Sequence, residues 1–331
     1  MTFNSTSLFA RSFNNDFTDL FNNEKLVPMS KLTIITTVSS QMNEYCSCDW
    51  KYEDTYKYVF SGANGVYEAG YYVHYDENKQ IKDMTIELAT SYGCPFKCKY
   101  CASSSINKFH IAEEDTILEI LKTIYFTHNL NFADNIHITF TGTGDFYYTE
   151  KLLNGIIPKI KKIYTGSYYT FSSCAWNDEL VKKVERMSLG GYIKNLQISF
   201  LSCDVNKIKQ VITNYIDRCS IDELIKIIDN ASSSLRDKFR INYIMIKDFN
   251  DSDQDFDDFI NKFITLKDII KVRISKLNKT NCSEKNSLSS PDDSRLQEME
   301  KRCKNAGFNA YIFSSKVNDN LNCGQLITEI K

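Results

Sequence analysis

The sequence contains no apolar run of about 18 residues, the length that a membrane-spanning helix requires, so we expect no membrane span. Neither sign of charge dominates, because 40 Lys and Arg residues stand against 42 Asp and Glu residues, for a net charge of −2. This balance gives no bulk attraction to nucleic acid and leaves only a local basic patch as a means of binding it. Proline (4) and glycine (12) are scarce, a bias more typical of an AT-rich genome than of a particular function.

Eleven cysteines are present, an odd number, in a chain of 331 residues. Disulfide scaffolds are typical of small secreted chains with an even cysteine count, and neither condition holds here. Residues 1–21 are rich in Asn and Phe and lack the apolar core of a signal peptide. We therefore expect a reducing, cytoplasmic location in which the thiols stay free.

Three of the cysteines form the segment Cys94-Pro-Phe-Lys-Cys98-Lys-Tyr-Cys101, with C-x3-C-x2-C spacing. This pattern can ligate three irons of a [4Fe–4S] cluster and leave the fourth iron open to a ligand, whereas clusters that only carry electrons usually have a fourth Cys. Two alternatives are three buried core thiols and a zinc site. Zinc sites usually pair two C-x2-C units, and only one such unit occurs here. The pattern therefore favours an open-cornered iron–sulfur cluster.

The segment before the cysteines is rich in β-forming residues. Residues 56–61 and 66–74 flank the Gly-Ala-Asn-Gly turn at 62–65, which predicts a β-hairpin. Residues 84–90 predict a further strand that leads directly into the cysteine segment. Residues 1–50 show no clear period, and we expect neither a long helix nor an RNA-binding helical domain there.

Strands and helices then alternate to the end of the chain. Helices are predicted at 113–127, 151–163, 178–187, 205–215, 221–231, 254–266 and 292–306, and strands at 136–141, 168–173, 196–201, 240–246, 269–275 and 310–313. Such alternation predicts an α/β fold with a parallel sheet, here a partial (β/α)6 barrel over residues 84–331. The hairpin region (51–83) and a short extension (1–50) would precede it. Chemistry in such barrels lies at the C-terminal ends of the strands, where the cysteine segment falls.

Two further segments carry chemical signals. Gly142-Thr-Gly144-Asp145 follows a predicted strand, and by itself it indicates only a tight turn between strand and helix. Cys323 lies in Cys-Gly-Gln-Leu near the C-terminus, where a lone cysteine usually has no special role.

In combination, these segments resemble the class A radical S-adenosylmethionine (SAM) methyltransferases, the RlmN/Cfr family, which methylate C2 or C8 of an adenosine in 23S ribosomal RNA. The resemblance covers about residues 55–331 in colinear order. Its matching segments are 67–70, 90–94, 142–146, 171–174, 199–201, 250–251, 277–279 and 323–326. Each motif is weak alone, whereas their order and spacing are fairly specific.

The resemblance implies a [4Fe–4S] cluster on Cys94, Cys98 and Cys101, with SAM as the second cofactor. It implies that Cys323 accepts a methyl group from one SAM, and that a radical made from a second SAM activates this methyl for addition to an sp² carbon. A thioether suits this role because its sulfur stabilises an adjacent radical. The residues that would hold SAM are Gly144, Asp145, Ser172, Ser199 and Asn278.

Glu68 would act as proton acceptor beside an adenine-like base in RNA or in a smaller nucleotide. A flavodoxin- or ferredoxin-type protein would supply electrons. The chain departs from the family pattern at Glu87, where the family has a resolving Cys that deprotonates the adduct and forms a disulfide with the methyl carrier. Glu87 can accept the proton but cannot form the disulfide. Cys174 is a candidate substitute, or simply a small thiol in place of a serine.

These departures leave a second function open. A radical SAM enzyme on the same scaffold would abstract hydrogen from a small molecule and transfer no methyl group. The family's basic stretch before the last Cys is reduced to Ser314-Ser-Lys316 here, which weakens the case for ribosomal RNA as the substrate.

Overall fold

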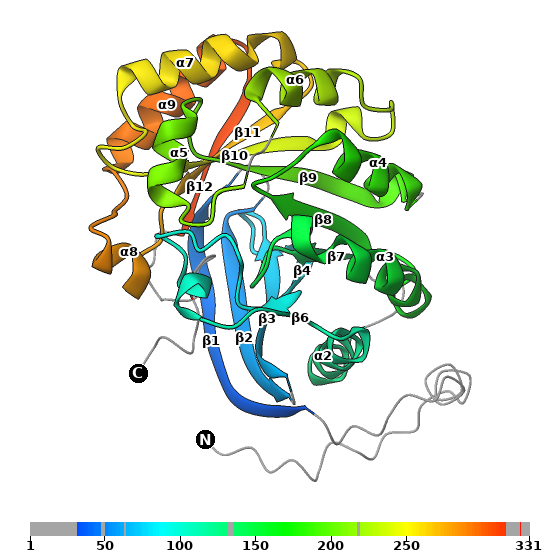
Figure 1. Cartoon of the computed structure of the whole chain (residues 1–331). Helices are drawn as coiled ribbons and strands as arrows, with labels where there is room; N and C mark the ends of the chain where they lie inside the picture. Colours follow the sequence, from blue (N-terminus) through cyan, green and yellow to red (C-terminus); the bar gives the residue numbers. More distant parts are fainter. Residues whose placement is uncertain are drawn as a thin grey trace.

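The structure is a computed structural model that describes residues 32–47, 50–62, 64–130, 135–187, 189–216, 219–315 and 325. Among these residues, ten strands form a closed barrel in the order β1-β12-β11-β10-β9-β8-β7-β4-β3-β2 (Figure 1). Seven neighbouring strands pair in parallel: β4 (Ile81–Leu88), β7 (Ile136–Phe140), β8 (Tyr168–Ser173), β9 (Ile193–Phe200), β10 (Phe239–Met245), β11 (Lys271–Lys276) and β12 (Asn309–Ser315). The predicted α/β barrel with a parallel sheet is confirmed.

The N-terminal strands complete the barrel. The predicted hairpin is present as β2 (Tyr52–Gly62) and β3 (Gly65–Tyr75), joined by β1 (Thr33–Cys46), which lies in the segment without a clear sequence period. β3 pairs antiparallel with β4, and β1 pairs antiparallel with β12 through Tyr45 and Ser315. Strands that precede the parallel sheet in sequence therefore bridge its two edges.

Helices cover the outside of the parallel strands (Figure 1). They are α2 (Glu114–Thr127), α3 (Phe146–Ile163), α4 (Asp178–Arg186), α5 (Val205–Val211), α6 (Ile221–Asp229), α7 (Asp253–Phe263), α8 (Asn281–Lys285) and α9 (Asp293–Asn305). Short 3-10 turns occupy Ala102–Ser105, Gly190–Tyr192, Arg236–Lys238 and Ile264–Leu266, and a two-stranded sheet joins β5 (Ser91–Tyr92) to β6 (His110–Ile111). In the described part of the chain, no helix is both long and apolar enough to cross a bilayer.

The two faces of the barrel strands differ in character. On β4, Ile86 and Leu88 are fully buried in the apolar core with the helices, whereas Thr85 and Glu87 line an internal cavity. Side chains of a strand alternate between faces, so one face can build the core while the other stays polar. The barrel thus has an apolar outer layer and a polar lumen, which is where a ligand site can form.

Candidate active site

One cavity of about 310 Å³ collects the predicted site residues, a volume within the usual range of small-ligand pockets. The predicted residues that line it are Glu68, Glu87, Cys94, Cys98, Cys101, Gly144, Asp145, Ser172, Ser199 and Asn278. Cys323 lies outside the described residues. Gln325, from the same C-terminal motif, also lines the cavity, where its Nε2 donates to the carbonyl of Lys279 at 2.7 Å.

The cysteine loop is held by backbone bonds to the end of α5. Cys98 forms an antiparallel bridge with Ile212, and the Lys99 N–H donates to the carbonyl of Val211 at 2.8 Å. The predicted helix 205–215 therefore ends at Val211, because the following residues pair with the loop instead. On the other side, Thr280 Oγ1 donates to the carbonyl of Tyr100 at 3.0 Å.

The three loop thiols suit a cluster better than a single metal ion. Cys94, Cys98 and Cys101 form no disulfide with a described residue, and all three are half-buried. Within the described ranges, no three His, Cys, Asp or Glu side chains gather closely enough to hold one metal ion. A [4Fe–4S] cluster takes its cysteines on separate irons, so its ligands need not meet at one point. Burial raises the pKa of the Cys94 thiol, and the nearby Asp145 and Cys98 raise it further. Bound cationic iron would lower this pKa and favour the thiolate.

The turn after β7 packs directly against the segment that leads into the cysteines. Gly144 has a φ of +117°, and a Cβ there would lie 2.6 Å from Ser91 Oγ. The carbonyl of Thr143 accepts the Thr90 N–H at 2.9 Å. Glycine at position 144 therefore allows a positive φ and lets the turn pack closely against Ser91.

Asp145 begins α3 as its N-cap. One carboxylate oxygen accepts the Tyr147 N–H at 2.9 Å, and the other accepts the Cys174 N–H at 3.0 Å. Burial raises the pKa of Asp145, although these hydrogen bonds and one with Ser173 oppose the increase. The carboxylate thus has a positioning role beside any contact with a ligand.

Serine hydroxyls from adjacent strands meet on the cavity wall. Ser172 Oγ and Ser199 Oγ lie 3.4 Å apart, and Gln197 Nε2 donates to Ser172 Oγ at 3.1 Å. Asn278 follows β11 and lines the same cavity. This wall offers hydroxyl and amide groups to a polar ligand.

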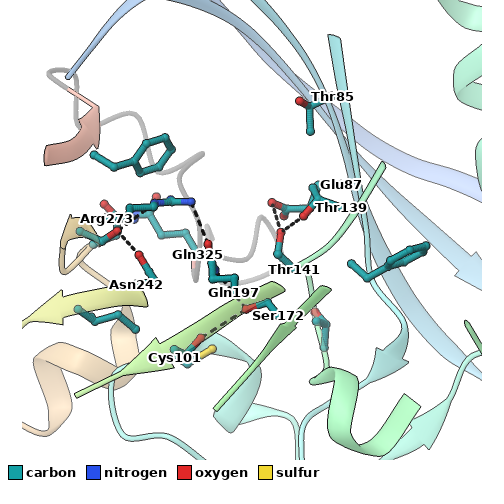
Figure 2. Close-up of a pocket in the computed structure, with 18 of the residues that line it drawn as sticks. Thr85, Glu87, Cys101, Thr139, Thr141, Ser172, Gln197, Asn242, Arg273 and Gln325 are labelled. Carbon is teal, nitrogen blue, oxygen red and sulfur yellow. Dashed lines mark hydrogen bonds between the residues drawn. The ribbon is translucent and has the colours of Figure 1, made fainter. Parts of the chain in front are cut away.

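Glu87 lies beside Thr139 and Thr141 on the cavity wall (Figure 2). Thr141 Oγ1 donates to Glu87 Oε2 at 3.4 Å, and Thr139 donates to Thr141 at 3.0 Å. Glu68 lines the cavity from β3. Cys174 is buried beside the cysteine loop, packed in the same apolar cluster as Cys94.

Several lining residues did not come from motif analysis: Lys57, His137, Gln197, Arg240, Asn242, Arg273 and Ser275. Their signal in the sequence is polar residues at every second position of otherwise apolar strands. That alternation is visible in the sequence, but it does not say which face is enclosed.

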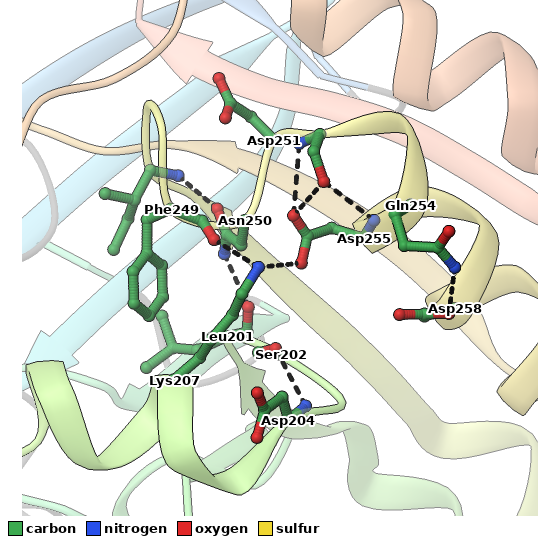
Figure 3. Close-up of polar contacts among 12 residues, drawn as sticks. Leu201, Ser202, Asp204, Lys207, Phe249, Asn250, Asp251, Gln254, Asp255 and Asp258 are labelled. Carbon is green, nitrogen blue, oxygen red and sulfur yellow. Dashed lines mark hydrogen bonds and ion pairs between the residues drawn. The ribbon is translucent and has the colours of Figure 1, made fainter.

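Asn250, part of a matching segment, has a structural position instead. It is fully buried, and its Nδ2 donates to the carbonyls of Leu201 and Ile244 at 2.7 and 2.8 Å (Figure 3). Its Oδ1 accepts the Ile246 N–H at 2.7 Å. It joins the ends of β9 and β10 without lining the cavity.

Comparison with known proteins agrees with this geometry. The family model of the radical SAM superfamily matches residues 88–260. Two curated proteins named "Probable dual-specificity RNA methyltransferase RlmN" are similar. The protein from Chlorobium chlorochromatii (strain CaD3) is 24% identical over 176 residues, covering 52% of this chain and 47% of its own. The protein from Malacoplasma penetrans (strain HF-2) is 28% identical over 181 residues, covering 50% and 47%.

The chain thus matches about half the length of these curated relatives. Among solved structures, a radical SAM methyltransferase from Sphaerobacter thermophilus has the same fold. Its TM-score is 0.72 at 17% identity, covering 96% of this chain and 86% of that one.

Proposed function

The chain belongs to the radical SAM superfamily, and from this premise we propose that it is a methyltransferase with Cys323 as methyl carrier. Its substrate is an adenine-like base, in RNA or in a smaller nucleotide. The names of the curated relatives support methyl transfer to RNA. The observation that carries the proposal is that the nine described residues given a role by the resemblance line one cavity, together with Glu87 and Gln325.

Each group has a role in this proposal. Cys94, Cys98 and Cys101 would hold the [4Fe–4S] cluster, which supplies the electron for reductive cleavage of SAM when it is bound. Gly144 and Asp145 would orient the ammonium group of SAM. The hydroxyls of Ser172 and Ser199 would bind other polar groups of SAM. Asn278 would bind from the next loop.

The remaining residues would transfer the methyl group and accept protons. Cys323 would carry the methyl group as a thioether and present it to an sp² carbon of the base. Glu68 would act as proton acceptor beside that base, and Glu87 would accept the proton of the adduct. Electrons would come from a flavodoxin- or ferredoxin-type donor.

A mass-spectrometric experiment tests the carrier. The protein is reconstituted with iron and sulfide without oxygen, incubated with SAM, and digested. A 14-Da methyl adduct is expected on the peptide that contains Cys323, and Cys323→Ala is expected to abolish product methylation while SAM cleavage persists. Cys303→Ala is the matched control, because Cys303 is buried in α9 and does not line the cavity. Absence of any adduct, together with full activity of Cys323→Ala, would exclude the carrier role.

One observation favours the second candidate, hydrogen abstraction without methyl transfer. Glu87, not a thiol, faces the cavity where the family has its resolving Cys. S-adenosylhomocysteine formed beside 5′-deoxyadenosine during turnover would exclude that candidate, since only methyl transfer makes it.

A further inference from the structure

Four exposed lysines surround the cysteine loop. They are Lys99 within the loop, and Lys108, Lys209 and Lys285 in segments that contact it. No carboxylate of a described residue pairs with any of the four. The Lys209 ammonium instead lies over the ring of Tyr215, 5.2 Å from its centroid. These charges are therefore available to a partner.

Two of these lysines belong to segments that pack on the flanks of the loop. The carbonyl oxygen of Lys108 lies against Gly93, since a Cβ at Gly93 would be only 2.2 Å from it. Lys209 lies in α5, two residues before Val211, whose carbonyl accepts the Lys99 N–H at 2.8 Å. Both segments are thus held beside the cysteines by their backbones.

The fourth lysine lies at the end of α8. Lys285 immediately precedes Asn286, whose Nδ2 donates to the carbonyl of Lys99 at 3.1 Å. In Figure 1, α8 lies beside the cyan segment that carries the cysteines. The four lysines therefore come from three different segments that meet at one loop.

The segments around the loop contain few acidic residues, although the whole chain has a net charge of −2. No Asp or Glu occurs in residues 93–111 or 205–216. The single acidic residue in residues 279–288 is Glu284, which pairs with Lys279 at 2.7 Å. This surface is therefore basic on a chain that is slightly acidic.

Three carboxylates border these segments without cancelling the charge. Asp145 is N-cap of α3 and fully engaged with backbone N–H groups, Asp204 is N-cap of α5, and Glu113 accepts from Asn64 Nδ2 at 2.7 Å. The half-buried Lys97 adds a further positive charge to the four exposed lysines. Five lysines thus face three carboxylates, and an excess of one sign attracts a partner of the other.

Two exposed apolar side chains lie within the same region. Phe109 and Ile111 are 36% and 44% exposed. The Phe109 ring packs on Tyr148 at 5.8 Å between centroids, and Tyr148 packs on Phe96 of the cysteine loop at 5.0 Å. The basic surface consists of Lys99, Lys108, Phe109, Ile111, Lys209 and Lys285.

The composition of the basic surface favours a protein partner over RNA. Protein interfaces combine an apolar centre with a polar rim. Surfaces that bind nucleic acid favour arginine, and no arginine occurs in residues 93–111, 205–216 or 279–288. None of the six residues lines the cavity, so the basic surface is separate from the site that would hold the substrate.

The basic surface lies directly over the cysteines that would hold the cluster. Lys99 stands between Cys98 and Cys101 in the sequence, and Lys108 packs on the residue before Cys94. A protein docked here is separated from the cysteines by the loop alone, whereas helices cover the outside of the parallel strands (Figure 1). Since electron transfer slows steeply with distance, this face gives an electron donor the shortest approach.

We propose that the basic surface docks a small acidic protein that carries electrons. One electron passes from the reduced donor to the cluster, so that the donor is oxidised and the cluster is reduced by one electron. The inference rests on the proposed function only for the presence of the cluster. Complexes for electron transfer are weak and bury little area, which suits four lysines and two apolar side chains.

The test measures how fast a flavodoxin in its hydroquinone form reduces the cluster-reconstituted protein, from the loss of cluster absorbance in stopped flow. The double variant Lys108→Glu with Lys285→Glu is expected to lower the second-order rate constant at least about tenfold at low ionic strength, and salt should reduce the difference. Carbodiimide cross-linking and mass spectrometry should join lysines of the basic surface to carboxylates of the flavodoxin.

The control variant has the same change in net charge at the other end of the barrel. It combines Lys271→Glu with Lys301→Glu, because both lysines are exposed and Lys271 begins β11, opposite the strand ends where the loop lies. Its rate constant should change by less than about twofold. Photoreduced 5-deazariboflavin, an uncharged small reductant, should reduce all three proteins equally, which establishes that their clusters are intact.

Several results would overturn the proposal. They are equal flavodoxin rates for the parent and the Lys108 and Lys285 double variant, cross-links confined to other lysines, and reduction by 5-deazariboflavin but by neither a flavodoxin nor a ferredoxin. An RNA oligonucleotide that blocks cross-linking and binds the double variant more weakly would assign the surface to RNA instead. If Cys323 is never methylated while the lysine-dependent reduction persists, the methyltransferase is rejected and the docking surface is retained.

Discussion

The carboxylate of Asp145 accepts the backbone N–H of Cys174 across two neighbouring strand ends, at 3.0 Å. Its other oxygen caps α3 through the Tyr147 N–H. One side chain therefore fixes the turn after β7, the start of the next helix and the end of β8. This turn borders the cysteine loop and lines the cavity, so its backbone conformation determines the shape of the cavity there.

The conformation of that turn depends on Gly144. In Gly144→Ala, the added methyl group would lie 2.6 Å from Ser91 Oγ and 2.7 Å from Thr90 Oγ1, at a φ of +117° that side chains rarely adopt. We expect the free energy of unfolding to fall by about 1–3 kcal/mol, measured in urea, and SAM binding to weaken. Gly191→Ala should leave stability unchanged or slightly raised, because a Cβ there meets nothing within 4 Å. Equal stability of the two variants would contradict this account.

Asn250 is expected to matter for stability rather than for chemistry. Asn250→Ala would leave the carbonyls of Leu201 and Ile244 and the Ile246 N–H without their side-chain partner in a fully buried site (Figure 3). Each buried group left unsatisfied costs about 1–3 kcal/mol, so we expect a loss of about 3 kcal/mol or more in chemical denaturation. Asp258→Asn on the exposed side of α7 should change stability by less than about 0.5 kcal/mol. A stable Asn250→Ala protein without activity would instead indicate a direct role in the site.

His128 should make stability depend on pH. Burial lowers the pKa of His128 from 6.5 to about 4, and the Tyr58 hydroxyl lies 2.6 Å from its Nε2. Between these two pKa values the unfolded state binds more protons than the folded state, so stability falls as pH decreases from about 6.5 to about 4. The upper limit of this loss is about 3 kcal/mol, reduced by partial solvent exposure.

Urea unfolding of the parent protein and of His128→Gln at several pH values measures the effect. Glutamine keeps an acceptor for the Tyr58 hydroxyl but does not titrate, so the decline over this pH window should become shallower. An identical slope in both proteins would show that other groups cause the acid sensitivity.

The sequence predicted which residues share one cavity better than it predicted the barrel's closure. Cys98, Gly144, Ser172 and Ser199 follow or end parallel strands, and such ends meet at one edge of a sheet, so their common cavity was expected. By contrast, β1 has mostly exposed side chains and no alternating pattern from which a strand could be recognised. Lys57 resembles a solvent-facing residue of a hairpin, and only pairing of β1 with β2 and β12 encloses it. Pairing between strands that are distant in the sequence encloses such a residue, and no local sequence pattern reveals that pairing.

Glu87 offers the sharpest test of how the proposed reaction ends. If its carboxylate accepts the proton of the adduct, Glu87→Gln should lower product release by about 10²-fold or more, the usual contribution of a positioned general base. Formation of 5′-deoxyadenosine should continue for a single turnover, and mass spectrometry should find the base still attached to Cys323. Thr141→Val is the matched control, because it removes the donor 3.4 Å from Glu87 Oε2 but keeps the carboxylate. We expect a much smaller effect there. Unchanged product release in Glu87→Gln would assign the proton to another group, for which Glu68 on the neighbouring strand β3 is a candidate because it lines the same cavity.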